Sequence, residues 1–309
     1  MRPLVWILAF LCMSPVAFAA DKPDWAFPVT EKIQPQVPPD DGKPKTAPGS
    51  SKTYTRTEIE DLFNPPDWYP DMHPPMPRVV SNGNAPQVRA CAACHLPIGT
   101  GHDESANVAS LPVSYFLQQM ADYKSGARKG SGSMTTIAKS ISDEEARAAA
   151  EYFASIKPRP WIKVIETADV AKTYVGPGNK RLVHPDRTME PIGRRIIEIP
   201  ENETRVLNRD PGSGFVAFVP VGAIAKGQAL VAGGGGTTAC ANCHGADLKG
   251  TAEIPGLAGR TATYIVRQLF MTQSGERDGV GTHPMKAVVA QLQTEDMLNI
   301  AAYLASMTP

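Results

Sequence analysis

Two stretches of the chain carry apolar residues with the spacing of one buried helical face. The first stretch has Ala146, Ala149, Ala150 and Phe153, and the second has Met297, Ile300, Ala301 and Leu304. Residues at positions i, i+3, i+4 and i+7 lie on one side of an α-helix, so each stretch predicts an amphipathic helix packed on a core. The run Ser142-Asp-Glu-Glu145 before the first stretch is a capping box, which marks where that helix begins.

This helical pattern occurs twice because the chain contains an internal repeat. The pairs at an offset of 149 residues include Tyr115 with Tyr264 and Arg128 with Arg277. Further helices are predicted to begin beside the two tyrosines, at Ser114 and Thr263. The fold class expected from the repeat is mainly all-α, with two homologous domains over residues 85–157 and 221–309.

Two segments outside the repeats have a different composition. Residues 20–84 form a proline-rich extension, since 14 of the 29 prolines fall between residues 20 and 90, and such sequence favours extended backbone. We expect residues 20–50 to be mobile and residues 54–80 to wrap partly on the first domain. Residues 158–220 form an insert between the domains.

The insert contains two strand-like runs, Arg195–Pro200 and Phe215–Val219, separated by a turn-rich sequence. A small β-containing element with hairpin-like strands is therefore expected between the two domains. Its expected role is to hold them at a fixed angle.

Residues 1–19 have the pattern of a secretory signal peptide. Arg2 provides the positive start, an apolar stretch follows, and Ala17-Phe-Ala19 is a small-x-small cleavage site. No later stretch approaches the about 20 apolar residues that cross a bilayer, so we expect an exported, periplasmic protein without a transmembrane anchor. The 31 basic and 31 acidic residues balance, which gives no reason to expect binding to nucleic acid.

Every cysteine beyond this signal belongs to one of two short motifs, Cys91-Ala-Ala-Cys94-His95 and Cys240-Ala-Asn-Cys243-His244. The pattern Cys-x-x-Cys-His is the attachment signature of c-type haem, in which the histidine then ligates the iron. A redox dithiol and a zinc site are the alternatives for Cys-x-x-Cys. A redox dithiol needs no following histidine, and a zinc site would have to join two motifs that lie 149 residues apart. We therefore predict two covalently bound haem c groups.

The sixth iron ligands are predicted to be Met134 and Met285, which we expect in equivalent non-helical loops of the two repeats. A methionine ligand raises the haem potential and closes the iron to substrates. His283 competes with Met285, and Met72 or Met76 could in principle reach the first haem. Met120 and Met297 are expected to be core residues. The expected surface or hydrogen-bonding residues are His73, His102 and His184.

These features together resemble the class I cytochromes c, and specifically the tandem di-haem cytochromes c. The resemblance covers about 85–157 and 221–308, and includes the haem motifs, a helix opening with Tyr115 or Tyr264, a methionine segment, and a final helix ending in Tyr303-Leu-Ala-Ser. It implies a small all-α fold around each haem, one-electron transfer, and haem-binding roles for the two tyrosines.

The resemblance also implies a partner for each proximal histidine. The carbonyl of Pro255 is expected to accept the ring N–H of His244, which would fix the orientation of that imidazole. Ala106 occupies the equivalent position in the first repeat. We therefore expect His95 to be supported in some other way.

The expected function is that of a periplasmic di-haem electron carrier rather than an enzyme, with other periplasmic redox proteins, or a membrane oxidase or dehydrogenase, as partners. One alternative is a peroxidase-like or sulfur-oxidising di-haem enzyme in which one iron is open or unusually ligated. Another is a cytochrome subunit of a periplasmic dehydrogenase, with residues 20–80 and 158–220 as docking surfaces.

Overall fold

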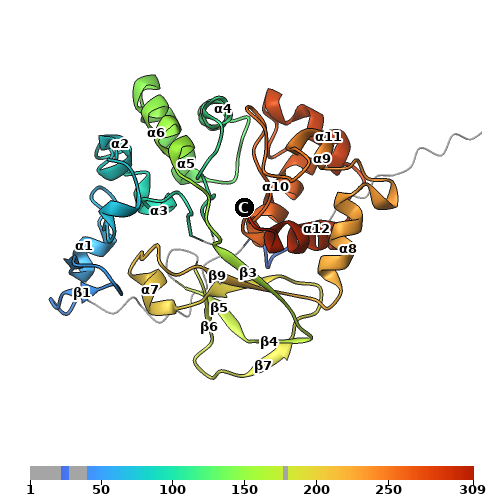
Figure 1. Ribbon diagram of the computed structural model, residues 1–309, viewed down its shortest axis with the longest axis horizontal. Helices are drawn as coiled ribbons and strands as arrows, with labels where there is room; N and C mark the ends of the chain where they lie inside the picture. The colour runs from blue at the N-terminus through green and yellow to red at the C-terminus, as the bar shows by residue number, and fades with distance from the viewer. Residues whose placement is uncertain (1–21, 28–39, 103, 177–179) are drawn as a thin grey trace, which may run out of the picture.

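Two groups of helices lie side by side above a layer of short strands (Figure 1). The computed structural model describes residues 22–27, 40–102, 104–176 and 180–309. The helices of the first domain include residues of the first haem motif, and those of the second domain include the second motif. The expectation of a mainly all-α protein with a small β-containing insert is confirmed.

The two repeats have matching helices in the same order. Those of the first repeat are α2 (Arg78–Ser81), α3 (Ala92–His95), α4 (Val113–Ser125), α5 (Gly132–Ser140) and α6 (Asp143–Ser155). Those of the second are α8 (Ala223–Val231), η3 (Gly234–Gly236), α9 (Ala241–His244), α10 (Ala262–Gln273), η4 (Val280–Thr282), α11 (His283–Val289) and α12 (Thr294–Ser306). The helix before the haem motif is much shorter in the first repeat than in the second.

The predicted apolar stripes form the centres of the two domain cores. In α6 the side chains of Ala149 and Phe153 are buried, and Ser142 and Glu145 form the expected capping box at its N-terminus. In α12 the side chains of Met297 and Leu304 are buried in the same way. The 3.6-residue period of the apolar positions is therefore what directs each terminal helix onto its own core.

In the part of the insert that the structure describes, the chain forms three small sheets and one helix. Its elements are β3 (Ile162–Glu166), β4 (Asp169–Ala171), β5 (Thr173–Val175), β6 (Arg181–Val183), β7 (Met189–Pro191), β8 (Ile197–Pro200), α7 (Glu203–Leu207) and β9 (Phe215–Val219). The predicted strands β8 and β9 pair antiparallel, with Ile197 opposite Phe218. On its other side β9 pairs in parallel with β3, which the sequence did not lead us to expect. The pairs β4–β7 and β5–β6 complete the sheets.

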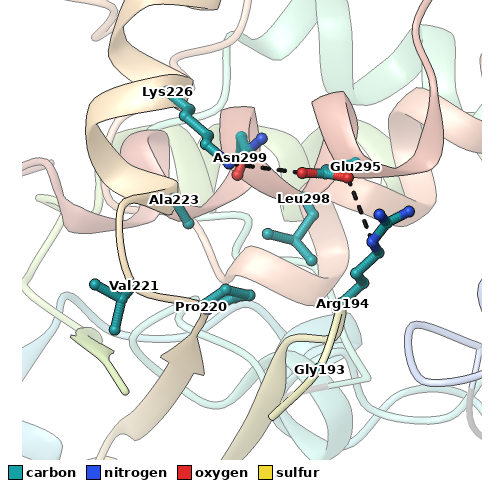
Figure 2. A pocket seen from close by; sticks show the side chains of 9 residues that line it. All are labelled: Gly193, Arg194, Pro220, Val221, Ala223, Lys226, Glu295, Leu298 and Asn299. Atoms are coloured by element: carbon teal, nitrogen blue, oxygen red, sulfur yellow. Dashed lines mark ion pairs between the residues drawn. The ribbon is translucent and has the colours of Figure 1, made fainter. Parts of the chain in front are cut away.

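The insert contacts the second domain at a small pocket (Figure 2). Glu295 of α12 lies 3.6 Å from Arg194 of the insert and 3.7 Å from Lys226 of α8. All three charged side chains are well exposed, so these ion pairs add little stability. The buried contacts nearby come instead from Ala217 and Val219 of β9, which lie in the core of the second domain.

The extension lies against both the first domain and the insert. Its elements are β1 (Lys45–Thr46), β2 (Thr53–Tyr54), α1 (Arg56–Glu60) and η1 (Pro70–Met72). Val79 and Val80 of α2 lie in the core of the first domain. Trp68 is fully buried, and its indole N–H donates to the carbonyl of Asn208 in the insert at 2.9 Å.

Residues 22–27 do not have the mobility expected for residues 20–50. Ala26 is completely buried in the core of the second domain, and its carbonyl accepts from Arg267 at 3.0 Å. Ala47 likewise packs with Trp68. Buried apolar contacts thus fix parts of this proline-rich segment in place. Residues 28–39 and the predicted signal peptide lie outside the described residues. Within the described ranges, no helix has the length and apolar character needed to span a membrane.

Candidate haem sites

Each attachment motif forms a single helical turn at the edge of its domain, α3 in the first and α9 in the second. Cys91 and Cys240 pack against the cores of their own domains, whereas Cys243 is exposed. All four sulfurs are free of disulfide bonds. Among the described residues, no group of three or more His, Cys, Asp or Glu side chains could hold a metal ion.

Both proximal histidines are oriented by a backbone carbonyl. His244 Nδ1 lies 2.8 Å from the carbonyl oxygen of Pro255, as expected. His95 Nδ1 lies 2.8 Å from the carbonyl oxygen of Ala106, so the expectation of a different support for His95 was wrong. The reason is that the acceptor belongs to the backbone, and alanine provides the same carbonyl as proline. In each case the other ring nitrogen, Nε2, is the one available to a metal.

The surroundings of these imidazoles favour the neutral form that ligates iron. Burial lowers the pKa of His95, and the positive charge of Arg128 lowers it further, against the opposing effect of the Ala106 carbonyl. Burial also lowers the pKa of His244, with Arg260 and Arg277 acting in the same direction. A neutral imidazole is the form that binds metals.

The two candidate methionines lie in helices and not in loops. Met134 is the third residue of α5, whose N-terminal cap is Ser131, and Met285 is the third residue of α11, which begins at His283 with Pro284 in its first turn. The expectation of non-helical loops was wrong because it overlooked these two start signals. The two helices are equivalent in the repeats, so the methionines still occupy matching positions.

Each domain gathers its own motif and methionine around one core. Tyr115, Cys91 and Met134 pack against the core of the first domain. Cys240 and Met285 pack against the core of the second. Phe153, which is fully buried, lies edge-on to His95 with ring centres 6.3 Å apart. The candidate histidine and methionine ligands of one iron therefore come from two different helices of the same repeat.

Three of the remaining histidines lie beside aspartate carboxylates. His283 is about half exposed and lies 3.4 Å from Asp278, while His73 and His184 lie 3.1 and 3.0 Å from Asp67 and Asp186. His102 differs from our expectation of a surface or hydrogen-bonding residue. Its ring is buried, and its Nε2 has no hydrogen-bond partner among the described residues.

A symmetric cluster of polar side chains joins the two domains. Arg128 donates to Gln268 at 2.9 Å and to the hydroxyl of Tyr264 at 3.2 Å, both in the second domain. Arg277 donates in return to Gln119 at 3.0 Å and to the hydroxyl of Tyr115 at 2.6 Å, both in the first domain. The exchange of equivalent contacts gives this interface an approximate twofold symmetry.

The same interface includes backbone hydrogen bonds between the segments that carry the two arginines. Lys129 N–H donates to the Glu276 carbonyl at 2.8 Å, and Asp278 N–H donates to the Ala127 carbonyl at 2.7 Å. Although burial raises the pKa of the Tyr264 phenol, Arg128 and Arg277 lower it more, and the net pKa is below its ordinary value. The cluster is thus positively charged.

The arginine cluster fits the carboxylates of bound haem. The Nε–H groups of Arg128 and Arg277 are buried and have no hydrogen-bond partner within the described part of the chain. The nearby buried carboxylate of Asp122 accepts from Gln118 at 2.8 Å instead of from either arginine. Buried guanidinium groups need anionic partners, and the propionates of a haem provide them. The sequence signal for this cluster was that its Tyr, Gln and Arg residues recur in both repeats at the same offset of 149 residues.

Comparisons with known proteins agree with this geometry. A sequence model of the family "Cytochrome c" matches residues 224–308. Cytochrome c-554(548) of Halomonas halodenitrificans is 38% identical over 68 residues, which are 22% of this chain and 82% of that protein.

Two longer relatives match more than two thirds of the chain. Cytochrome c4 of Azotobacter vinelandii is 25% identical over 229 residues, covering 70% of this chain and 84% of that protein. The "Thiosulfate dehydrogenase electron acceptor" of Thiomonas intermedia is 25% identical over 228 residues, covering 72% of this chain and 80% of that protein. The chain belongs to the cytochrome c family.

Proposed function

We propose that this protein is a periplasmic electron carrier with two covalently attached haem c groups, each ligated by one histidine and one methionine. The proposed ligands are His95 with Met134 and His244 with Met285. The single observation that carries the proposal is the repetition: each domain core gathers one attachment motif and one methionine from equivalent helices. The match to cytochrome c4 over most of both chains supports two haems.

The cysteines and histidines have separate tasks in this proposal. The four cysteine sulfurs form thioether bonds that keep the haems attached, and the histidines hold the iron on one side. The Ala106 and Pro255 carbonyls fix each imidazole ring by accepting its Nδ1 proton. When bound, each haem supplies a one-electron couple between ferric and ferrous iron.

The arginine cluster would hold the haem propionates at the boundary between the domains. Arg128 is bonded to Gln119 of its own domain and Gln268 of the other, so its position depends on both. Tyr115 and Tyr264 bind the arginine of the opposite domain and would thereby keep the two haem edges at the shared interface. Such an arrangement favours electron exchange within the molecule.

The partners are proposed to be redox proteins outside the cytoplasmic membrane, in line with the predicted signal peptide. The name of the relative from Thiomonas intermedia, an electron acceptor of a thiosulfate dehydrogenase, supports a dehydrogenase as the electron donor. In that case the protein accepts electrons and performs no substrate chemistry itself. Co-purification of a second polypeptide with the exported protein would test this pairing.

Replacing Met134 or Met285 by alanine is expected to remove about half of the far-red charge-transfer absorption that a methionine bonded to ferric haem iron gives. Each substitution should abolish one of two equivalent methionine bonds and lower the potential of that haem. Absorption spectra of the oxidised and reduced proteins measure the effect. Met189→Ala is the control, because Met189 is 63% exposed in the insert and should leave the band unchanged. A full band in either ligand variant would contradict the proposal and favour a haem enzyme with another ligand or an open iron.

A further inference from the structure

The two haem-attachment motifs differ sharply in how they are covered. Ala92 and Ala93, between the cysteines of the first motif, are 1% and 0% exposed. Their counterparts between the cysteines of the second motif are Ala241, which is half-buried, and Asn242, which is exposed. Since the motif sequences are nearly the same, the difference comes from what lies against them.

The insert covers the first motif. Leu96, which directly follows His95, forms a small buried core with Trp161, Val206 and Phe215 of the insert. The indole N–H of Trp161 also donates to the carbonyl of Gly101 at 3.1 Å, in the loop behind the motif. The first motif is thereby sealed from water on the side where the second is open.

Arg209 is the charged residue of the insert that reaches the motif itself. Its guanidinium Nη1 donates to the carbonyl oxygen of Ala93, inside the Cys-x-x-Cys-His turn, and its Nε donates to the carbonyl of Ile59 at 2.8 Å. Arg209 is only 8% exposed and has a φ of 54°, in the left-handed region that disfavours any residue with a side chain. The contacts of its side chain offset this local strain.

The positive charge of Arg209 is only partly balanced. Glu60 lies 3.5 Å from its Nη2, but the Glu60 side chain is 47% exposed, so water screens the carboxylate. On the second motif the equivalent residue of Ala93 is Asn242, which is exposed. The first haem motif therefore has a buried cation bonded to its own backbone, whereas the cations that act on the second motif, Arg260 and Arg277, act on the imidazole of His244.

We propose that Arg209 is a positioning and tuning residue that raises the reduction potential of the first haem. The inference rests on the proposed function, because it requires a haem attached at Cys91 and Cys94. Ferric haem carries one more positive charge than ferrous haem, so a buried cation nearby favours the ferrous form. Burial under the insert acts in the same direction, since a low-dielectric surrounding disfavours the more highly charged state.

The test is a site-resolved redox titration of Arg209→Gln. The methyl signals of the two ligating methionines in the reduced protein, assigned with Met134→Ala and Met285→Ala, report on the two haems separately by NMR. At a fixed ambient potential, the ratio of reduced to oxidised first haem is expected to fall about tenfold, equivalent to about 59 mV for a one-electron couple. The second haem should be unchanged.

Three further variants keep the test decisive. Arg209→Lys retains the positive charge, so the reduction potential of the first haem should stay close to that of the unaltered protein. A decrease in that potential as large as in Arg209→Gln would overturn the role of charge. Glu60→Gln, at an exposed position, should raise the first potential alone, and it tests the proposal even if the Arg209 variants do not fold. Arg205→Gln removes an arginine that pairs with Asp210 within the insert and should shift neither haem.

Haem content and the two methionine signals are measured first on every sample. Their absence from the unaltered protein would count against the proposed function. If both are present and Arg209→Gln shifts neither haem, or shifts both equally, the role of Arg209 is overturned while the carrier function stands.

Discussion

Replacing Gly227 by alanine is expected to destabilise the second domain by about 3 kcal/mol or more. Helices α8 and α12 cross at this residue, and an added Cβ would overlap the backbone carbonyl of Asn299 and lie 2.9 Å from the Cβ of Tyr303. Overpacking usually costs about 1–3 kcal/mol, and the cost is greater where backbone and not a flexible side chain must move. The α8–α12 contact closes the core around the second motif, so its loss should also loosen the haem site.

Urea denaturation of the haem-loaded protein measures this effect, with the absorption of the second haem as the probe. Gly132→Ala is the matched control, because Gly132 lies in the first turn of α5 with no atom near the place of an added Cβ. That control should be neutral or slightly stabilising, since alanine reduces the entropy of the unfolded chain. An unchanged urea midpoint for Gly227→Ala would mean that the two helices are further apart than the structure has them.

Replacing Phe153 by alanine is expected to destabilise the first domain by about 3–5 kcal/mol, the range for a fully buried phenylalanine. Phe153 is 0% exposed and lies between Phe116, at a ring-centre distance of 6.2 Å, and Tyr152, at 5.1 Å. Its ring also contacts the imidazole of His95 edge-on. A cavity there should reduce stability and allow the proximal histidine to move, which would lower the potential of the first haem.

Phe153→Leu is the matched variant, because the equivalent position of the second repeat is Leu304, which is 2% exposed. Leucine fills most of the volume, and we expect it to recover more than half of the stability lost with alanine. Thermal unfolding and a redox titration of the same samples provide the two readouts. If Phe153→Ala lowered the stability by less than about 1 kcal/mol, the ring would not be part of a close-packed core.

Local sequence patterns were sufficient for the helices and for the attachment motifs. The capping box at Ser142 and the apolar stripe through Phe153 predicted α6, and the repeat offset predicted its counterpart α12. These signals act over fewer than about ten residues, which is the range over which helical periodicity and capping operate. The methionine helices α5 and α11 were missed, although Ser131 and Pro284 were there to mark their starts.

The support of His95 shows why some site contacts cannot be read from side-chain identity. Ala106 accepts the imidazole proton through its backbone carbonyl, which every residue possesses. The position of that oxygen depends on the path of the loop after the motif, and Gly101 and other turn residues shape that path. Comparison of the two repeats therefore identified the correct residue, Ala106, but led to the wrong conclusion that His95 is supported in some other way.

By itself, the sequence determined that this protein has two equivalent helical units, each with a Cys-x-x-Cys-His motif and a methionine at a matching position. The tertiary structure alone decided which residues meet across the units: Arg128 with Tyr264, Arg277 with Tyr115, and Arg209 with the carbonyl of Ala93. These pairs are separated by more than a hundred residues in the chain. Their meeting depends on the packing of whole domains and of the insert, because no local periodicity or capping rule acts over such distances.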